Sequence, residues 1–360
     1  MATRSATRAY RDEHEDAFAE GYFRRLGDAV VSSVGLGTYL GDPTDAVDDD
    51  YEAAIRTGLE AGCNVIDTAI NYRCQRSERV VGRALERSDV DREAVFVATK
   101  GGYLPFDGDH PTDPTAYVTE EYVEPGILDP DDLVAGSHCI DPDYLDDQLD
   151  RSLANLGLET IDCYYVHNPA TQLRERSREA VYDALEDAFV RLEERADAGD
   201  IGCYGVATWQ AFRVPSDHPS YLSVPAVLER ARTAARTVGA EETRFRAIQL
   251  PFNAAMPEAA TERAHDGPDG PASVLEYALE TDVDVVTSAS IAQGSLADGV
   301  PSVDRRDDET PVQQAINVAR SAPGVTASLV GTSTETHVRE NVDAGAFAPL
   351  DDEAIGAVLE

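Results

Sequence analysis

The chain has 360 residues, of which 42% are hydrophobic and 27% are charged, and its 68 acidic and 30 basic side chains give a formal net charge of −38. The apolar fraction suffices for a large core and excludes a disordered chain. A surface this negative repels phosphates, so we expect no nucleic-acid partner.

Eight short runs of apolar and β-branched residues predict strands, and most are continuous rather than alternating, which is typical of strands buried on both faces. The predicted strands are residues 34–38, 64–70, 94–100, 161–167, 201–208, 245–252, 283–288 and 327–331. A helical pattern follows each strand, with capping residues such as Ser77 and Asp141 at the starts and glycines such as Gly62 and Gly157 at the ends. The predicted helices are residues 49–61, 77–87, 141–156, 178–198, 224–238, 272–280, 311–320 and 335–342.

Eight strands that each precede a helix predict an α/β fold, the (β/α)8 TIM barrel. The alternative is a doubly wound open sheet, which seldom has eight units of such even spacing. Residues 22–34 contain a Gly27-Asp28 turn between two short extended runs and predict an N-terminal hairpin at the bottom of the barrel. We see no linker, so we interpret residues 1–360 as a single domain with its core at about 20–350.

Two long loops follow predicted strands, at residues 101–140 and 253–271, and therefore fall on the face where barrel enzymes carry their chemistry. The first loop offers five ring-bearing side chains that either line the mouth of the barrel or fasten the loop to its rim. They are Tyr103, Phe106, Tyr117, Tyr122 and His138.

No apolar run approaches the roughly 18 residues of a membrane span, and the first residues are too polar for a signal peptide, so we expect a cytoplasmic protein without membrane contact. Carboxylates are spread along the whole chain, which we interpret as halophilic adaptation. An acidic interaction surface would need a block of like charge, and the clusters at residues 48–50 and 129–132 are interpreted as solvated helix starts. Five cysteines without a CxxC pair predict neither a disulfide framework nor a zinc site.

Lys100 is the only lysine in the chain, and every other strong cation is an arginine. Arginine does not replace lysine where a compact, titratable ammonium is required. Polar residues of three further kinds stand at or just beyond the ends of predicted strands, namely Asp67, Tyr72 and His167. A tyrosine with a pKa near 10 becomes a workable acid if an ammonium held by a carboxylate lies beside it.

The stretch at residues 64–85, NVIDTAINYRCQRSERVVGRAL, resembles the aldo-keto reductase signature, in which an Asp-Thr-Ala segment precedes the catalytic tyrosine. The resemblance covers nearly the whole chain in the right order. It continues through residues 35–38 (GLGT), 98–100 (ATK), 162–168 (DCYYVHN), Gln249 with Asn253, and residues 331–341 (GTSTETHVREN).

The resemblance implies an NAD(P)H-dependent oxidoreductase that reduces an aldehyde or ketone to an alcohol. The family's catalytic tetrad falls on Asp67, Tyr72, Lys100 and His167. By this resemblance Tyr72 donates the proton, Lys100 lowers the pKa of Tyr72, Asp67 anchors Lys100, and His167 orients the carbonyl oxygen. Taken singly, these residues also fit structural roles, such as a rim aromatic, a core histidine or a helix cap.

The resemblance also implies a nicotinamide cofactor, NADP with NAD as the alternative. The implied cofactor residues are Gly37, Thr38, Asn168, Thr208, Gln249, Ser288, Gly331, Thr332, Ser333, His337, Glu340 and Asn341. Three positions depart from the family pattern. The family's Ser-Asn pair is Ala207-Thr208 here. The aromatic that stacks on nicotinamide falls on Ser288, and Trp209 or Phe252 are candidate replacements for it. The family's basic residues for the 2′-phosphate fall on Gly331 and His337.

Two other function classes compete with a reductase. One is a nicotinamide-nucleotide-binding redox sensor or auxiliary subunit with slow turnover, which the altered cofactor positions favour. The other is a metal-dependent barrel hydrolase, but only His167 and Asp67 occupy strand ends where metal ligands would be needed, so we expect no metal site. The oligomeric state cannot be predicted from the sequence.

Overall fold

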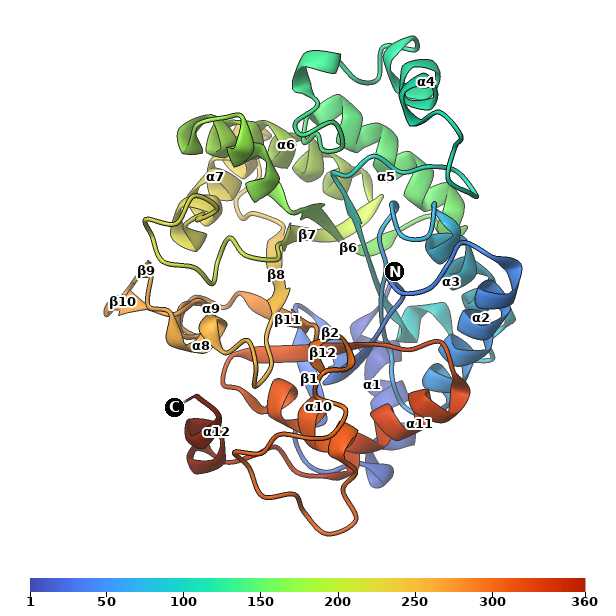
Figure 1. Cartoon of the computed structure of the whole chain (residues 1–360), viewed down its shortest axis with the longest axis vertical. Coiled ribbons are helices and arrows are strands. Elements are labelled where there is room, and N and C mark those ends of the chain that lie inside the picture. Colours follow the sequence, from blue (N-terminus) through green and yellow to red (C-terminus); the bar gives the residue numbers. More distant parts are fainter. Residues whose placement is uncertain (360) are drawn as a thin grey trace.

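The computed structural model describes residues 1–359, and within them eight parallel strands close into a barrel (Figure 1). Each barrel strand pairs with the next one along the chain, and the last closes on the first through the pairing of Gly331 with Gly37. The (β/α)8 barrel is therefore confirmed, and the open sheet is wrong. The barrel strands are β3 (Val34–Gly37), β4 (Val65–Asp67), β5 (Phe96–Gly101), β6 (Ile161–His167), β7 (Ile201–Ala207), β8 (Phe245–Pro251), β11 (Asp284–Ser288) and β12 (Val325–Gly331).

Helices surround the barrel in Figure 1, and those that follow its strands match the predicted helices closely. They are α2 (Asp45–Glu60), α3 (Arg76–Arg87), α5 (Pro142–Leu156), α6 (Arg178–Ala198), α7 (Val224–Thr237), α9 (Val274–Thr281), α10 (Pro311–Ser321) and α11 (Glu335–Asp343). Both faces of most barrel strands are buried, one against the helices and one inside the barrel. This explains why the strands read as continuous apolar runs.

Helix α2 begins four residues earlier than predicted, because Thr44 caps it by accepting a hydrogen bond from the Val47 N–H at 3.4 Å. Asp49 and Asp50 are exposed as predicted, but Asp48 is buried. Its interpretation as part of a solvated helix start was wrong, because its carboxylate faces arginines of the neighbouring loop and of helix α3.

The bottom of the barrel is covered by the predicted hairpin, formed by β1 (Phe23–Leu26) and β2 (Ala29–Ser32). Leu26 and Val31 of this hairpin pack into the barrel interior. Helix α1 (Arg4–His14), which the sequence did not predict, lies beside the hairpin, and its Tyr10 hydroxyl donates a hydrogen bond to the Leu59 carbonyl. The bottom is therefore sealed, and the opposite end is left for a site.

The two long segments carry short elements of their own. Residues 101–140 contain helix α4 (Pro114–Val118) and a small apolar cluster around Tyr122. Residues 253–271 contain helix α8 (Glu258–Thr261) and most of a hairpin made of β9 (His265–Gly267) and β10 (Gly270–Ala272). The described chain ends in helix α12 (Asp352–Leu359), and none of its helices combines the length and apolarity needed to cross a bilayer.

Candidate active site

The carboxyl ends of three neighbouring strands bring the four predicted catalytic side chains together. Asp67 ends β4, Lys100 lies near the end of β5 and His167 ends β6, while Tyr72 stands in the loop between β4 and α3. Lys100 Nζ lies 2.5 Å from Asp67 Oδ1 and 3.4 Å from Tyr72 Oη. The rings of Tyr72 and His167 lie 6.0 Å apart between their centroids. The four side chains therefore form one cluster.

The Lys100 ammonium is fully buried, and each of its three protons has an acceptor. These acceptors are Asp67 Oδ1, the Thr68 carbonyl at 2.7 Å and Tyr72 Oη. Burial lowers the pKa of Lys100, but the Asp67 carboxylate and the Tyr72 hydroxyl raise this pKa by more, so the ammonium stays charged. On its other side Asp67 accepts a hydrogen bond from Gln249 Nε2 at 2.7 Å, which fixes Gln249 beside the cluster.

Two opposing effects set the ionisation of Tyr72. Burial raises its pKa above the usual value, and the Lys100 ammonium lowers it. The sequence predicted the effect of Lys100, which is present, but burial outweighs it and the net direction is upward. The phenol is therefore protonated near neutral pH, which is the state that a proton donor needs.

His167 carries a neutral imidazole at the wall of the site. Burial lowers its pKa well below the usual range, and the charge of Lys100 adds to this. Its Nδ1 is buried and has no hydrogen-bond partner within residues 1–359. Its backbone carbonyl is bound by the ring of His138, whose Nε2 lies 2.7 Å away. A buried imidazole nitrogen without a partner is costly.

The cluster opens into a cavity of about 680 Å³, a volume typical of small-molecule sites. Asp67, Tyr72 and His167 line this cavity. So do seven of the predicted cofactor residues, namely Gly37, Thr38, Asn168, Thr208, Gln249, Ser288 and Gly331. Much of the remaining wall is apolar and comes from Tyr39, Leu40, Tyr103, Trp209 and Ile291.

A family model described as the aldo/keto reductase family matches residues 33–302, which is most of the chain and includes this cluster. The chain belongs to the aldo/keto reductase family. The resemblance inferred from the sequence motifs is confirmed.

Curated relatives match this aldo/keto reductase over part of its length. An aldo-keto reductase of Mycobacterium avium (strain 104) is 30% identical over 166 residues, which are 46% of this chain and 43% of that protein. Glycerol 2-dehydrogenase (NADP(+)) of Saccharomyces cerevisiae is 32% identical over 142 residues, which are 39% of this chain and 31% of that protein. The matches thus span less than half of the length of these relatives.

Solved structures resemble it over nearly its whole length. An aldo/keto reductase from Klebsiella pneumoniae in complex with NADP and acetate is 18% identical, with a TM-score of 0.62 and 94% of each chain covered. A glycerol dehydrogenase from Gluconobacter oxydans is 19% identical, with the same TM-score and 94% of each chain covered. At these identities the likeness concerns the fold.

In this aldo/keto reductase, five predicted cofactor residues lie outside the wall of the cavity, and all of them follow β12. They are Thr332, Ser333, His337, Glu340 and Asn341. Gly331 continues directly into this stretch from the cavity, and His337 is exposed on α11, whereas Asn341 is buried. No arginine or lysine lines the cavity in the part of the chain that the structure describes.

Of the two candidates for the missing stacking aromatic, only one lines the cavity. Phe252 is fully buried in the core and does not line the cavity, so it is excluded. Trp209 lines the cavity and is 41% exposed, and its backbone N–H donates a 2.7 Å hydrogen bond to Asn168 Oδ1. Sequence reasoning missed Tyr39 and Leu40, although both directly follow the first predicted strand, where barrel sites form.

The first long loop does both of the things that the sequence left open. Tyr103 lines the cavity, with its ring 5.1 Å from that of His167. Phe106, Tyr117 and Tyr122 instead pack against one another, and the Tyr122 ring meets that of Tyr144 in α5, so they fasten the loop to the outside of the barrel. The segment 253–271 contributes nothing to the wall of the cavity.

Ser77 does not cap helix α3, which corrects its predicted role. Its hydroxyl donates a 2.7 Å hydrogen bond to the Thr38 carbonyl and so ties the start of α3 to the loop after β3.

Within the described residues, no three His, Cys, Asp or Glu side chains are grouped so that they could hold a metal ion.

Proposed function

We propose that this aldo/keto reductase is an NADP(H)-dependent oxidoreductase that reduces an aldehyde or ketone to an alcohol. The observation that carries the proposal is the distance of 3.4 Å between the buried Lys100 ammonium and the hydroxyl of Tyr72, a residue that lines the cavity together with His167. A protonated phenol beside a buried cation is suited to giving a proton to a carbonyl oxygen. The cavity volume lies within the range of small-molecule sites.

The amide side chains of the cavity fit a nicotinamide carboxamide. Gln249 Nε2 is engaged by Asp67, so its Oε1 is left to accept from the carboxamide NH₂. Asn168 Oδ1 is engaged by the Trp209 N–H, so its Nδ2 is left to donate to the carboxamide oxygen. Thr208 and Ser288 would flank the same group. We assign NADP(H) because the K. pneumoniae structure holds NADP and two curated relatives carry NADP(+) in their names.

When bound, the nicotinamide supplies hydride to the carbonyl carbon. His167 donates a hydrogen bond to the carbonyl oxygen and fixes its direction. Tyr72 Oη transfers its proton to that oxygen as the C=O bond becomes C–OH, and the Lys100 ammonium stabilises the phenolate that remains. Asp67 holds the ammonium in place, and solvent returns the proton to Tyr72 after the alcohol leaves.

The mouth of the cavity indicates the class of substrate. Three of the most exposed large hydrophobic side chains of the described chain stand there, with exposed fractions of 59% for Tyr39, 50% for Leu40 and 41% for Trp209. Exposed apolar side chains that adjoin one cavity indicate that a ligand covers them. Because no arginine or lysine lines the cavity and its His167 is neutral, we propose an uncharged carbonyl compound with an apolar or aromatic body.

Turnover with benzaldehyde and with its 4-carboxylate derivative tests both the activity and this substrate class. We expect kcat/KM to be at least about tenfold higher for the uncharged aldehyde, because a buried carboxylate without a partner loses its hydration. Equal values would contradict the substrate class. Saturable binding of the cofactor without alcohol formation from any aldehyde would contradict the reductase and favour the redox sensor.

We also propose that the protein works in concentrated salt. The chain carries many more carboxylates than cationic side chains, so its negative charges repel one another, and dissolved ions screen that repulsion. We expect the melting temperature to rise between low and molar KCl, and to rise less in sorbitol of equal osmolarity, which does not screen charge. A melting temperature that is the same in low and molar KCl would contradict the adaptation.

A further inference from the structure

Tyr72 is followed by an arginine that takes no part in the proposed proton transfer and yet is buried. The side chain of Arg73 is only 1% exposed, and so is removed from the solvent that normally hydrates a guanidinium. The cavity wall includes Tyr72 but not Arg73, so this cation does not face the substrate. A buried cation persists only where its partners replace the lost water.

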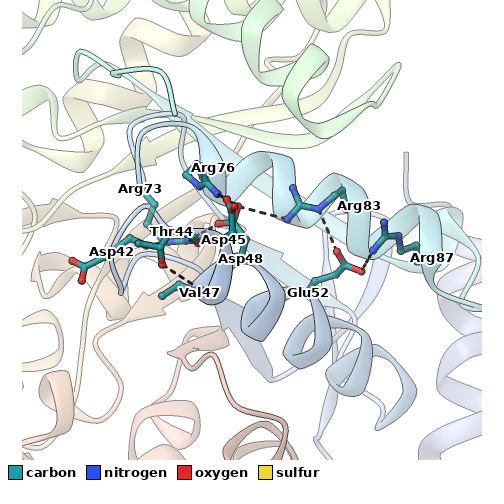
Figure 2. Close-up of polar contacts among 10 residues, drawn as sticks. All are labelled: Asp42, Thr44, Asp45, Val47, Asp48, Glu52, Arg73, Arg76, Arg83 and Arg87. Atoms are coloured by element: carbon teal, nitrogen blue, oxygen red, sulfur yellow. Dashed lines mark hydrogen bonds and ion pairs between the residues drawn. The ribbon is translucent and has the colours of Figure 1, made fainter. Parts of the chain in front are cut away.

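The partners of Arg73 come from the loop after β3 and from the first turn of α2. Its Nη2 forms an ion pair with Asp48 Oδ1, its Nε donates to the Asp42 carbonyl at 3.1 Å, and the same Nη2 lies 3.3 Å from the Thr44 carbonyl. Its guanidinium also lies 5.2 Å from the ring centroid of Tyr51. Figure 2 shows Arg73 and Arg76, the latter the first residue of α3, both directed toward Asp48.

These contacts join two walls of the cavity. Arg73 belongs to the loop that carries Tyr72, and Asp42 and Thr44 belong to the loop that carries Tyr39 and Leu40. The rings of Tyr39 and Tyr72 meet edge to face, with their centroids 5.0 Å apart. Arg73 thus fixes the proton donor relative to an apolar wall of the mouth.

The turn that Arg73 holds is strained. Arg73, Cys74 and Gln75 have φ angles of 48°, 56° and 67°, three consecutive left-handed residues of which none is glycine. Side chains with a Cβ disfavour this conformation, and it persists only where the surroundings enforce it. Gln75 has an enforcing contact of its own, through Nε2 to the Phe106 carbonyl at 3.1 Å.

We propose that Arg73 is a positioning residue for Tyr72. Its buried ion pair with Asp48 and its bonds to the Asp42 and Thr44 carbonyls hold the left-handed turn that presents the Tyr72 hydroxyl to Lys100. The inference rests on the proposed reductase function. It also gives the buried Asp48 carboxylate a role, as the partner that holds Arg73. Dissolved salt screens such a buried ion pair much less than an exposed one.

The same network offers a matched control at its outer end. Figure 2 shows that the series of ion pairs continues from Asp48 through Arg83 and Glu52 to Arg87. The Arg87 guanidinium lies 2.6 Å from Glu52 and is 59% exposed, and it has no contact with the Tyr72 loop. Arg87→Gln removes an arginine from this network without touching the strained turn.

Three substitutions of Arg73 separate a positioning role from a merely structural one. Arg73→Lys keeps the charge beside Asp48 but loses the forked bonds to the carbonyls, Arg73→Ala removes the clamp and keeps the strain, and Arg73→Gly removes both. Each variant is measured for kcat and KM, for the melting temperature, and for the cofactor Kd from the fluorescence of Trp209, which is the only tryptophan and lines the cavity.

We expect Arg73→Ala to lower kcat by about tenfold or more, because a small displacement of a reacting group lowers the rate steeply. Its cofactor Kd should stay within about twofold of the wild-type value. Arg73→Gly should recover part of the lost kcat because glycine adopts the turn without strain. Arg73→Lys, the variant that best preserves the fold, should fall between wild type and Arg73→Ala. Arg87→Gln should keep the wild-type kcat.

An active wild type in which folded Arg73→Lys and Arg73→Gly keep the wild-type kcat would overturn this inference alone. An equal loss of kcat in Arg87→Gln would also overturn it, because the effect would then reflect general packing of α2 against α3. A wild type that binds cofactor but reduces no carbonyl would overturn the proposed function and this inference with it.

Discussion

Tyr72→Phe should bind the reduced cofactor as tightly as the wild type and reduce carbonyl compounds about 10²–10⁴-fold more slowly, the range expected when a general acid is removed. The substitution removes only the hydroxyl that lies 3.4 Å from Lys100 Nζ and leaves the ring contacts with Tyr39 and His167 in place. Fluorescence titration through Trp209 gives the cofactor Kd, and single-turnover rates give the chemical step. An unchanged rate would remove Tyr72 from its assigned role.

The pH dependence of the wild type follows from the same group. Reduction needs the protonated phenol, so the activity is present below the pKa of Tyr72 and is lost as the pH rises through it. Burial holds that pKa above its usual value, and Lys100 acts in the opposite direction. The loss of activity should therefore appear only at alkaline pH.

Lys100→Arg should fold and lose about 10²-fold of the turnover. The ammonium occupies a site with no exposed surface and donates hydrogen bonds to the Asp67 carboxylate, the Thr68 carbonyl and the Tyr72 hydroxyl. A guanidinium is planar and larger, so it would displace the phenol, and a displacement of about 1 Å at a reacting centre costs on the order of 10²-fold. Near wild-type turnover in this variant would show that the reaction does not require a lysine at this position.

Lys100→Met gives the complementary result. Removing the cation removes the effect that lowers the pKa of Tyr72, so the alkaline limb of the pH–rate profile should move to higher pH while the maximal rate falls. The melting temperature is measured alongside, because the Asp67 carboxylate loses its partner. A limb that stays in place would show that Lys100 does not control the phenol.

The barrel could be predicted from the sequence because most of its strands are buried on both faces and most of its helices begin at a capping side chain. The bounds of β6 and α6 agree with the prediction to the residue. Helix α1 escaped prediction because only Thr7 and Tyr10 are buried along it, which leaves almost no apolar period to detect.

In the candidate site too, features that follow from the local sequence could be predicted, and features that depend on contacts between distant segments could not. Asp67, Lys100 and His167 could be predicted to meet because strand ends in a barrel meet at one rim. Asp48 could not be placed, because its burial depends on arginines of a loop and a helix that follow the next strand. Ser77 was misassigned for a similar reason, since its acceptor is a carbonyl of the loop after β3. The catalytic roles themselves stay predictions.

The most direct test of the central claim is the fate of a labelled hydride. Wild-type protein in molar KCl is incubated with benzaldehyde and NADPH in which both hydrogens of the reducing carbon are replaced by deuterium, and the product is analysed by mass spectrometry. The account predicts benzyl alcohol with one deuterium on the carbinol carbon, and strongly reduced formation of this product by Tyr72→Phe. Bound cofactor with no labelled alcohol would contradict it.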